Sequence, residues 1–178
     1  MKWDDENNGE CCQCVRRFTR GCNKMKKSKF SLTYKVGPIL GLVRKTDHET
    51  LAVWAIDCVE RVLPYFDKKY PEDRRPRSAI EVLQAWIDTG AFKMAVIRKA
   101  ALESHAAARE VGEDDAARSA ARAAGQAVAT AHVPAHSVAA ANYALQAIHR
   151  AATASDADAA VAKERAWQLQ HLLDLRKT

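Results

Sequence analysis

The chain has 178 residues, 48% of them hydrophobic, and its 28 lysines and arginines outnumber 22 acidic residues to give a net charge of +6. This length allows one domain of ordinary size with enough apolar side chains for a core. No apolar run reaches the ~18 residues of a membrane-spanning helix, and the first residues lack the apolar core of a signal peptide. We therefore predict a cytoplasmic protein that does not cross a membrane.

The charge is unevenly distributed along the chain. Residues 1–45 contain 11 Lys and Arg and 4 Asp and Glu, a net charge of +7. Residues 46–178 contain the other 17 basic and 18 acidic residues, a net charge of −1. The overall pI of about 9.1 is therefore not a property of the larger part, and it does not favour a nucleic-acid partner.

Four of the five cysteines lie within the first 22 residues. An odd number of cysteines crowded into one short segment is not typical of a secreted disulfide framework. Cys11, Cys14 and Cys22 are weak candidates for a zinc site, because the chain has one C-x-x-C spacing where the strong zinc motifs have two. We therefore predict no bound metal in this segment.

Residues 1–34 are predicted to form an irregular basic arm, separate from a helical domain over residues 35–178. Two hypotheses describe the arm. Either it is disordered, or residues 1–24 are a mis-started leader and Met25 is the natural start. The intact mass of the protein expressed from its own promoter distinguishes the two.

The part that follows the arm carries the signals of two helices. Thr46 and Glu49 match a capping box, which predicts a helix with Thr46 as its N-cap. Apolar residues then recur with helical spacing, and Pro64 is expected to kink this helix or end it a turn early. Pro76, near the first position, begins a second helix, and Gly90 is expected to terminate it.

Four further helices are predicted at about residues 91–111, 116–132, 135–152 and 155–175. Asp115 and Asp156 place the negative charge that a helix start favours before the second and the fourth of them. Residues 91–162 include 29 alanines, whose small side chains allow helices to pack closely. We predict an all-α fold of about six helices in stacked antiparallel hairpins, a single compact bundle with an irregular basic N-terminal arm.

His105, His132 and His136 are weak candidates for a metal site in the helical part. His132 and His136 are four residues apart, so on one helix their imidazoles would share a face. Pro134 lies between them and disturbs this geometry, and no glutamate follows His132 as a zinc protease motif requires. We therefore predict no metal and no cofactor, and histidines hydrogen-bonded to neighbouring helices.

A charged surface is expected at the first helical hairpin. It is predicted to contain Asp57, Glu60, Arg61, Arg75 and Arg77. Two interpretations apply to these residues: ordinary ion pairs within the chain, each worth little, and a partner-binding patch. No nucleophile elbow, phosphate-binding loop or dinucleotide fingerprint is present in the sequence, so we predict that the protein is not an enzyme.

Four strings of the helical part are distinctive when taken together. They are Asp47-His48-x-Thr50-Leu51-Ala-x-Trp54-Ala-x-Asp57-Cys58-x-Glu60-Arg61-Val-Leu-Pro64, Asp73-x-Arg75-Pro76-Arg77-x-Ala79-Ile80-Glu81, Ala123-Ala-Gly125-Gln-Ala-Val128-Ala-Thr130-Ala-His132-Val-x-x-His136 and Glu164-Arg165-Ala-Trp167-Gln168-Leu. With these strings the chain resembles, over about residues 35–175, a family of small helical bacterial proteins described as immunity proteins of polymorphic toxin systems. Gln126 stands where that pattern has histidine, and residues 1–34 fall outside the resemblance.

The resemblance implies a protein that binds one cognate toxin and neutralises it by protein–protein contact. If the charged surface makes this contact, charge reversal at Arg75 and Arg77 should abolish protection and leave the fold intact. Two alternatives stay open: a nucleic-acid-associated module that uses the basic arm, and a metal-dependent enzyme that uses the three histidines. A homodimer through an alanine-rich face also stays open.

Overall fold

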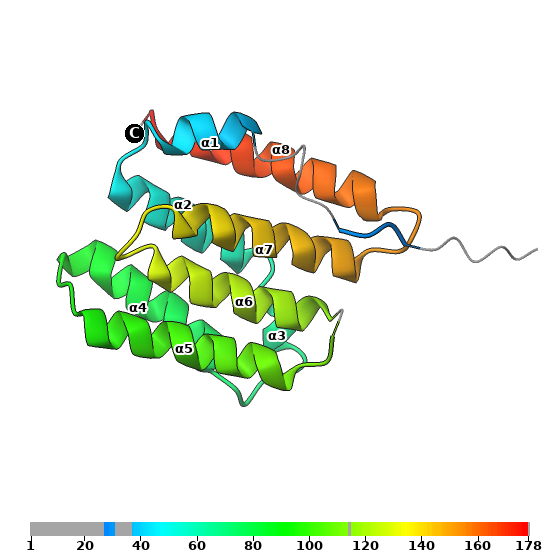
Figure 1. The fold of residues 1–178 in the computed structure, drawn as a ribbon, viewed down its shortest axis with the longest axis horizontal. Helices are drawn as coiled ribbons and strands as arrows, with labels where there is room; N and C mark the ends of the chain where they lie inside the picture. The colour runs from blue at the N-terminus through cyan, green and yellow to red at the C-terminus, as the bar shows by residue number, and fades with distance from the viewer. Residues whose placement is uncertain (1–26, 31–36, 114, 178) are drawn as a thin grey trace, which may run out of the picture.

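The computed structural model describes residues 27–30, 37–113 and 115–177, and no strand occurs among them (Figure 1). The helices of this part are α1 (Gly37–Val43), α2 (His48–Glu60), α3 (Pro64–Asp67), α4 (Arg75–Thr89), α5 (Met94–Glu110), α6 (Ala116–Ala129), α7 (His136–Ala151) and α8 (Ala157–Leu175). The six predicted helices correspond to α2 and to α4 through α8, so the all-α prediction is confirmed. None of the described helices combines the length and hydropathy that crossing a bilayer requires.

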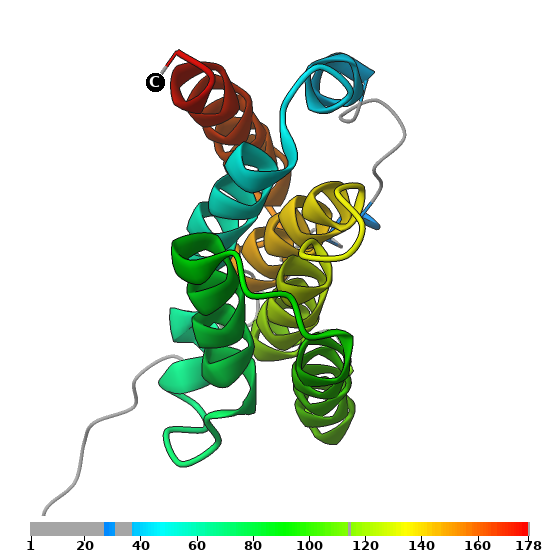
Figure 2. The ribbon, with the colours of Figure 1, turned by 90° about the vertical axis from the view of Figure 1, so that its left-hand side faces the viewer.

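The helices form two packed layers, which Figure 2 shows from the end of the bundle. One layer holds α8, α2 and α4, and the other holds α1, α7, α6 and α5. Consecutive helices from α4 to α8 run antiparallel, as Figure 1 shows, so the prediction of stacked hairpins is also confirmed. α6 occupies the centre and packs against α2, α3, α4, α5 and α7.

The start of α2 differs from the predicted start. The helix begins at His48 with Asp47 as its N-cap, and the Asp47 carboxylate accepts a hydrogen bond of 2.8 Å from the Thr50 amide. The Thr46 hydroxyl instead donates to the Leu42 carbonyl, at 2.8 Å, in the short helix α1. Aspartate caps a helix at least as well as threonine. The prediction of Thr46 as N-cap is therefore wrong, because α1 engages its hydroxyl.

The other predicted helix ends have mixed outcomes. α2 stops at Glu60 and Pro64 begins α3, so the proline ends the helix early because it cannot occupy a helix interior. Gly90 terminates α4 in the left-handed conformation, with φ of 66°. Asp115 caps α6, since its carboxylate accepts from the Ala117 amide at 2.8 Å. Asp156 occupies the N-cap position of α8, as predicted, but its carboxylate makes no capping hydrogen bond. The carboxylate accepts instead from the Thr153 hydroxyl at 2.6 Å.

Small side chains allow α6 to lie at the centre. Its buried residues are alanines with one serine, one glycine and one valine. The glycine, Gly125, permits the closest approach: a Cβ added there would lie 2.6 Å from Cε1 and 2.7 Å from Nδ1 of the His105 ring on α5. The imidazole therefore fills the space that an alanine side chain would need.

Replacing Gly125 with alanine tests this contact. At an open helix position the change raises the free energy of unfolding by roughly 1 kcal/mol, because alanine is the better helix former. Here we expect a decrease of about 1–2 kcal/mol, because the added methyl group displaces the His105 ring. Urea unfolding of Gly125→Ala, His105→Ala and the double variant measures the effect. In the His105→Ala background the same change should stabilise, and stabilisation by Gly125→Ala alone would contradict the proposed clash.

Candidate functional site

The solvent-facing side of α6 is a single line of polar residues. Between Ala117 and Ala129, every residue of α6 is buried except Arg118, Arg122 and Gln126. These three side chains are four residues apart, so they lie along one face of the helix. Between residues 117 and 129, α6 is therefore accessible to solvent along one face, and two of the three side chains on that face are arginines.

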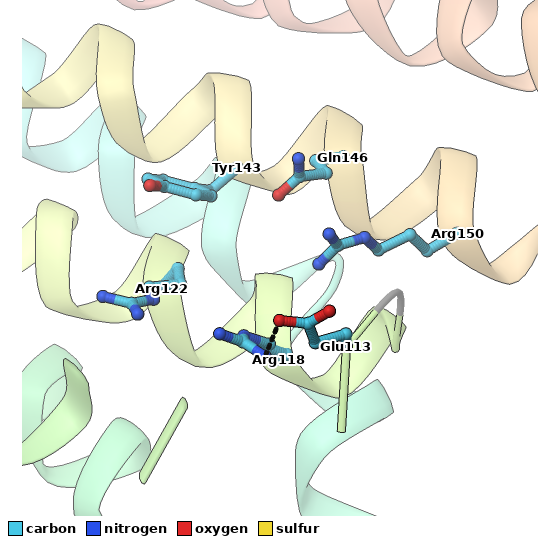
Figure 3. Close-up of a pocket in the computed structure, with 6 residues that line it drawn as sticks. All are labelled: Glu113, Arg118, Arg122, Tyr143, Gln146 and Arg150. Carbon is cyan, nitrogen blue, oxygen red and sulfur yellow. Dashed lines mark ion pairs between the residues drawn. The ribbon is translucent and has the colours of Figure 1, made fainter. Parts of the chain in front are cut away.

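α7 presents a matching line beside that of α6. Its half-buried residues Tyr143, Gln146 and Arg150 follow at intervals of three and four, so they also share one face. The two lines border an open groove of about 500 Å³, which Figure 3 shows in close-up. We call it the arginine groove, and its lining residues are Glu113, Arg118, Arg122, Tyr143, Gln146 and Arg150.

Three guanidinium groups and one carboxylate line the arginine groove. The Glu113 side chain is 91% exposed, and its carboxylate lies 4.0 Å from Nη1 of Arg118 (Figure 3). At that distance the two groups attract each other without a hydrogen bond. Arg122 has neither a hydrogen bond nor an ion pair with any described residue. Among the described residues, Arg122 is therefore a positive charge of the groove without a close carboxylate.

Hydrogen bonds between α6 and α7 fix one end of the groove. Nη1 of Arg150 donates to the hydroxyl of the buried Ser119 at 2.7 Å. That hydroxyl donates to Oε1 of Gln146 at 3.1 Å. Because the Gln146 oxygen accepts this bond, its amide NH₂ is the group that can donate to a ligand. The network holds both long side chains of α7 in position at the groove.

The histidines lie farther along α6 and α7. The rings of His132 and His136 are 5.1 Å apart, and Nδ1 of His136 donates to Oε1 of Gln126 at 2.8 Å. Burial, followed by the nearby charges of Arg122, Arg109 and His136, lowers the pKa of His105. Burial and the neighbouring His132 lower the pKa of His136. Both groups are thus favoured in the neutral form at physiological pH.

The histidine candidates are not assembled into a metal site. Over residues 27–30, 37–113 and 115–177, no three His, Cys, Asp or Glu side chains are placed to hold one ion. The prediction that the histidines are hydrogen-bonded to neighbouring helices is confirmed for His136, whose partner is Gln126 on α6. It is wrong for the buried Nδ1 of His105, which has no hydrogen-bond partner among the described residues. Cys11, Cys14 and Cys22 lie outside the described residues.

The predicted charged surface is divided among several intramolecular contacts. Arg61 forms a bidentate pair with Glu164, at 2.8 and 2.9 Å, and its guanidinium lies 3.9 Å from the centre of the Trp167 ring. The Trp167 ring stacks on His171, whose Nε2 lies 2.6 Å from a carboxylate oxygen of Asp57. Together these side chains form a continuous series of contacts between α2 and α8.

Arg75 and Arg77 each lie between two carboxylates. The pairs, with nitrogen–oxygen distances of 2.5–2.7 Å, are Arg75–Asp73, Arg75–Glu110, Arg77–Glu60 and Arg77–Asp67. The pair with Glu110 joins the start of α4 to the end of α5, and those of Arg77 join α4 to α2 and α3. All five residues of the predicted surface therefore have a partner within the chain.

The arginine groove was not predicted from the sequence. The available signal was the repeated spacing of four, Arg118 with Arg122 on one helix and Gln146 with Arg150 on the next. On an alanine-rich helix this spacing is equally typical of an ordinary solvated face. The tertiary structure adds the missing information, because it buries most of α6 and leaves Arg118 and Arg122 among its few solvent-accessible side chains.

The fold and the site together define a two-layer all-α domain with a positively charged, solvent-open groove. A family model described as "Imm-5 like putative immunity protein" matches residues 41–175. The chain therefore belongs to this family of immunity-like proteins, and the resemblance carried by the four sequence strings is confirmed. No curated protein and no solved structure gives a significant match to the chain.

Proposed function

We propose that this protein is an immunity protein that binds a cognate toxin in the cytoplasm and neutralises it by direct contact. The observation that carries the proposal is the family match over residues 41–175, which takes in all of α2 to α8. The helices α2 to α8 are thus the unit to which the family role applies. In this role the protein acts by occupying the surface of its partner, without catalysis.

The fold supports binding by a preformed surface. The helices pack around two clusters of buried apolar residues, so little conformational entropy is lost when a partner docks. The arginine groove presents arginine and tyrosine side chains, the residue types that contribute most to binding energy at protein interfaces. Fixed positive charge also accelerates association with a partner of opposite charge.

Co-expression with the toxin encoded beside the gene tests the proposed function. Cells that make the toxin and this protein should grow, whereas cells that make the toxin alone should not. The two proteins should also co-elute as a stoichiometric complex in size-exclusion chromatography with light scattering. Growth inhibition that persists at equal expression, with no complex, would contradict the proposal.

A second proposed contact surface contains Asp57, Glu60, Arg61, Arg75 and Arg77. Its test is the charge reversal Arg75→Glu with Arg77→Glu, and the expected result is a loss of toxin affinity. Each of these arginines neutralises two carboxylates, so the variant should also unfold at a lower temperature. The affinity must therefore be measured where circular dichroism shows a folded sample. Unchanged affinity in that sample would remove this surface from the proposal.

A further inference from the structure

We propose that the arginine groove docks an acidic segment of the toxin, in extended conformation, whose alternate residues are Asp or Glu. This inference rests on the proposed function, because it names the chemistry of the partner surface. It concerns a different part of the molecule from the ion-paired surface at α2 and α4.

The positive charge of the arginine groove favours an anionic ligand. Arg122 has no carboxylate or hydrogen-bond partner among the described residues. Arg118 donates a long hydrogen bond of 3.5 Å to the Val111 carbonyl, and its one ion-pair partner among these residues is the exposed Glu113, at 4.0 Å. Both arginines project from a helix whose other residues between Ala117 and Ala129 are buried except Gln126, so part of their surroundings is protein and not water. A carboxylate that reaches them can replace the weak contact with Glu113 by a bidentate hydrogen-bonded pair, which is stronger.

The spacing of Arg118 and Arg122 matches the spacing of side chains on an extended peptide. Arg118 and Arg122 are four residues apart on α6, which separates their positions by about 6 Å along the helix axis. Alternate side chains of an extended segment lie on one side of it and are about 6.5–7 Å apart. Two carboxylates two residues apart can thus reach successive arginines. Arg150 and the Gln146 amide lie across the groove on α7 for further contacts.

The groove continues beyond Arg150. A neighbouring pocket of about 490 Å³ shares Gln146 and Arg150 with it and is also lined by the segment of residues 27–30. This segment is anchored, because Nζ of Lys27 donates to the carbonyls of Arg150 and Ala152 at the end of α7. Lys29, which is exposed, adds a further cation to the continued groove.

An acidic peptide fits this groove better than a nucleic acid. Single-stranded nucleic acid is bound by a row of aromatic side chains on which successive bases stack. The arginine groove has one aromatic residue, Tyr143, on its lining, and its continuation adds Phe30, whose ring packs against that of His149 at 5.5 Å between centroids. Bidentate guanidinium–carboxylate contacts need no such row, and the family match points to a protein partner.

Binding of short probes to the full chain tests the inference. The probes are a fluorescein-labelled peptide of alternating Glu and Ser, its Gln–Ser counterpart, a single-stranded oligonucleotide and inorganic phosphate as competitor. We expect the Glu peptide to bind and the Gln peptide not to bind. Arg122→Glu should weaken binding about tenfold or more, which corresponds to ~1.4 kcal/mol. Arg98→Glu, an exposed change on α5, is the matched control and should have little effect.

A second pair of variants tests the role of Glu113. Glu113→Gln removes the carboxylate that faces Arg118, so it should strengthen binding of the Glu peptide by roughly two- to fivefold. Glu103→Gln, on the exposed side of α5, is the control and should leave the affinity unchanged. A Glu113→Gln variant that binds no better than the wild type would contradict the view that this carboxylate competes with the ligand.

The outcomes separate this inference from the proposed function. Equal binding of the Glu and Gln peptides, or full binding by Arg122→Glu, would overturn the inference. Tighter binding of the oligonucleotide than of the Glu peptide would overturn the inference in favour of a nucleic-acid ligand. Displacement of the Glu peptide by millimolar phosphate would also overturn it, in favour of a site for small anions. If Arg122→Glu protects cells as well as the wild type does, the groove is excluded while the immunity function stands. If the wild type fails to bind the toxin, the function itself fails.

Discussion

Replacing Arg61 with alanine is expected to lower the free energy of unfolding by about 2–3 kcal/mol. The carboxylate of Glu164 is 5% exposed and accepts both of its bonds to Arg61, so the change leaves a buried charge without its cation. The same change uncovers the Trp167 ring on which the guanidinium lies. The Arg61 side chain is itself 41% exposed, and water that enters reduces the effect below that of a fully buried pair. Urea unfolding monitored by circular dichroism measures it.

The exposed pair of Arg74 with Glu81 provides the control for this prediction. Its side chains are 68% and 54% exposed, so Arg74→Ala should cost less than about 0.5 kcal/mol. Adding Glu164→Gln to the Arg61→Ala variant should restore part of the lost stability, because the neutral amide is cheaper to bury than the carboxylate. Equal effects of Arg61→Ala and Arg74→Ala would show that burial of Glu164 does not matter.

The charged surface shows which features of a site local sequence patterns can predict and which they cannot. The sequence placed Asp57 and Arg61 together at the first helical hairpin, and the structure has Asp57 on α2 and Arg61 at its C-cap. It could not identify Glu164 as the partner of Arg61, because the two residues are 103 positions apart and meet only when α8 packs on α2. Ion pairs of this kind are a property of the tertiary structure. The sequence could therefore predict the charges, and ion pairing within the chain as one of two interpretations, but not which residues form the pairs.

The helical fold was largely predictable, because its signals are local. Alanine-rich segments, Pro64, Gly90 and Asp115 each act within one turn of their own position, and the structure places helix boundaries near all of them. The two missed helices, α1 and α3, are short. Helices of this length are held by tertiary contacts more than by their own propensity, so sequence patterns give little sign of them.

The arginine groove was hidden for a different reason. Arg118 and Arg122 are visible in the sequence, but the burial of every residue around them depends on five neighbouring helices that surround α6. Before that arrangement is known, two arginines on an alanine-rich helix indicate only a polar face. The groove becomes a candidate site because the fold leaves so little else of α6 exposed.

The largest loss of stability is expected on replacing Trp54 with alanine, about 3–5 kcal/mol. Trp54 is fully buried at the centre of the cluster that holds α1 and α8 against α2, with Leu51 and Leu172 among its members. Its Nε1 donates to the Gln168 carbonyl at 2.9 Å, which fixes the position of α8. The cavity left by the indole cannot be filled without moving two helices. Thermal and urea unfolding of the variant measure the change.

Two further variants separate packing from the hydrogen bond. Trp54→Phe retains most of the apolar volume and removes the donor, so about 1–2 kcal/mol should be lost. Trp86→Ala, on the half-buried face of α4 where the indole rests against His48, should cost less than Trp54→Ala. If Trp54→Phe proves as damaging as Trp54→Ala, the bond to Gln168, and not the volume of the ring, is what holds α8 on α2. The second contact surface, which depends on this helix pair, would then be sensitive to any change at Trp54.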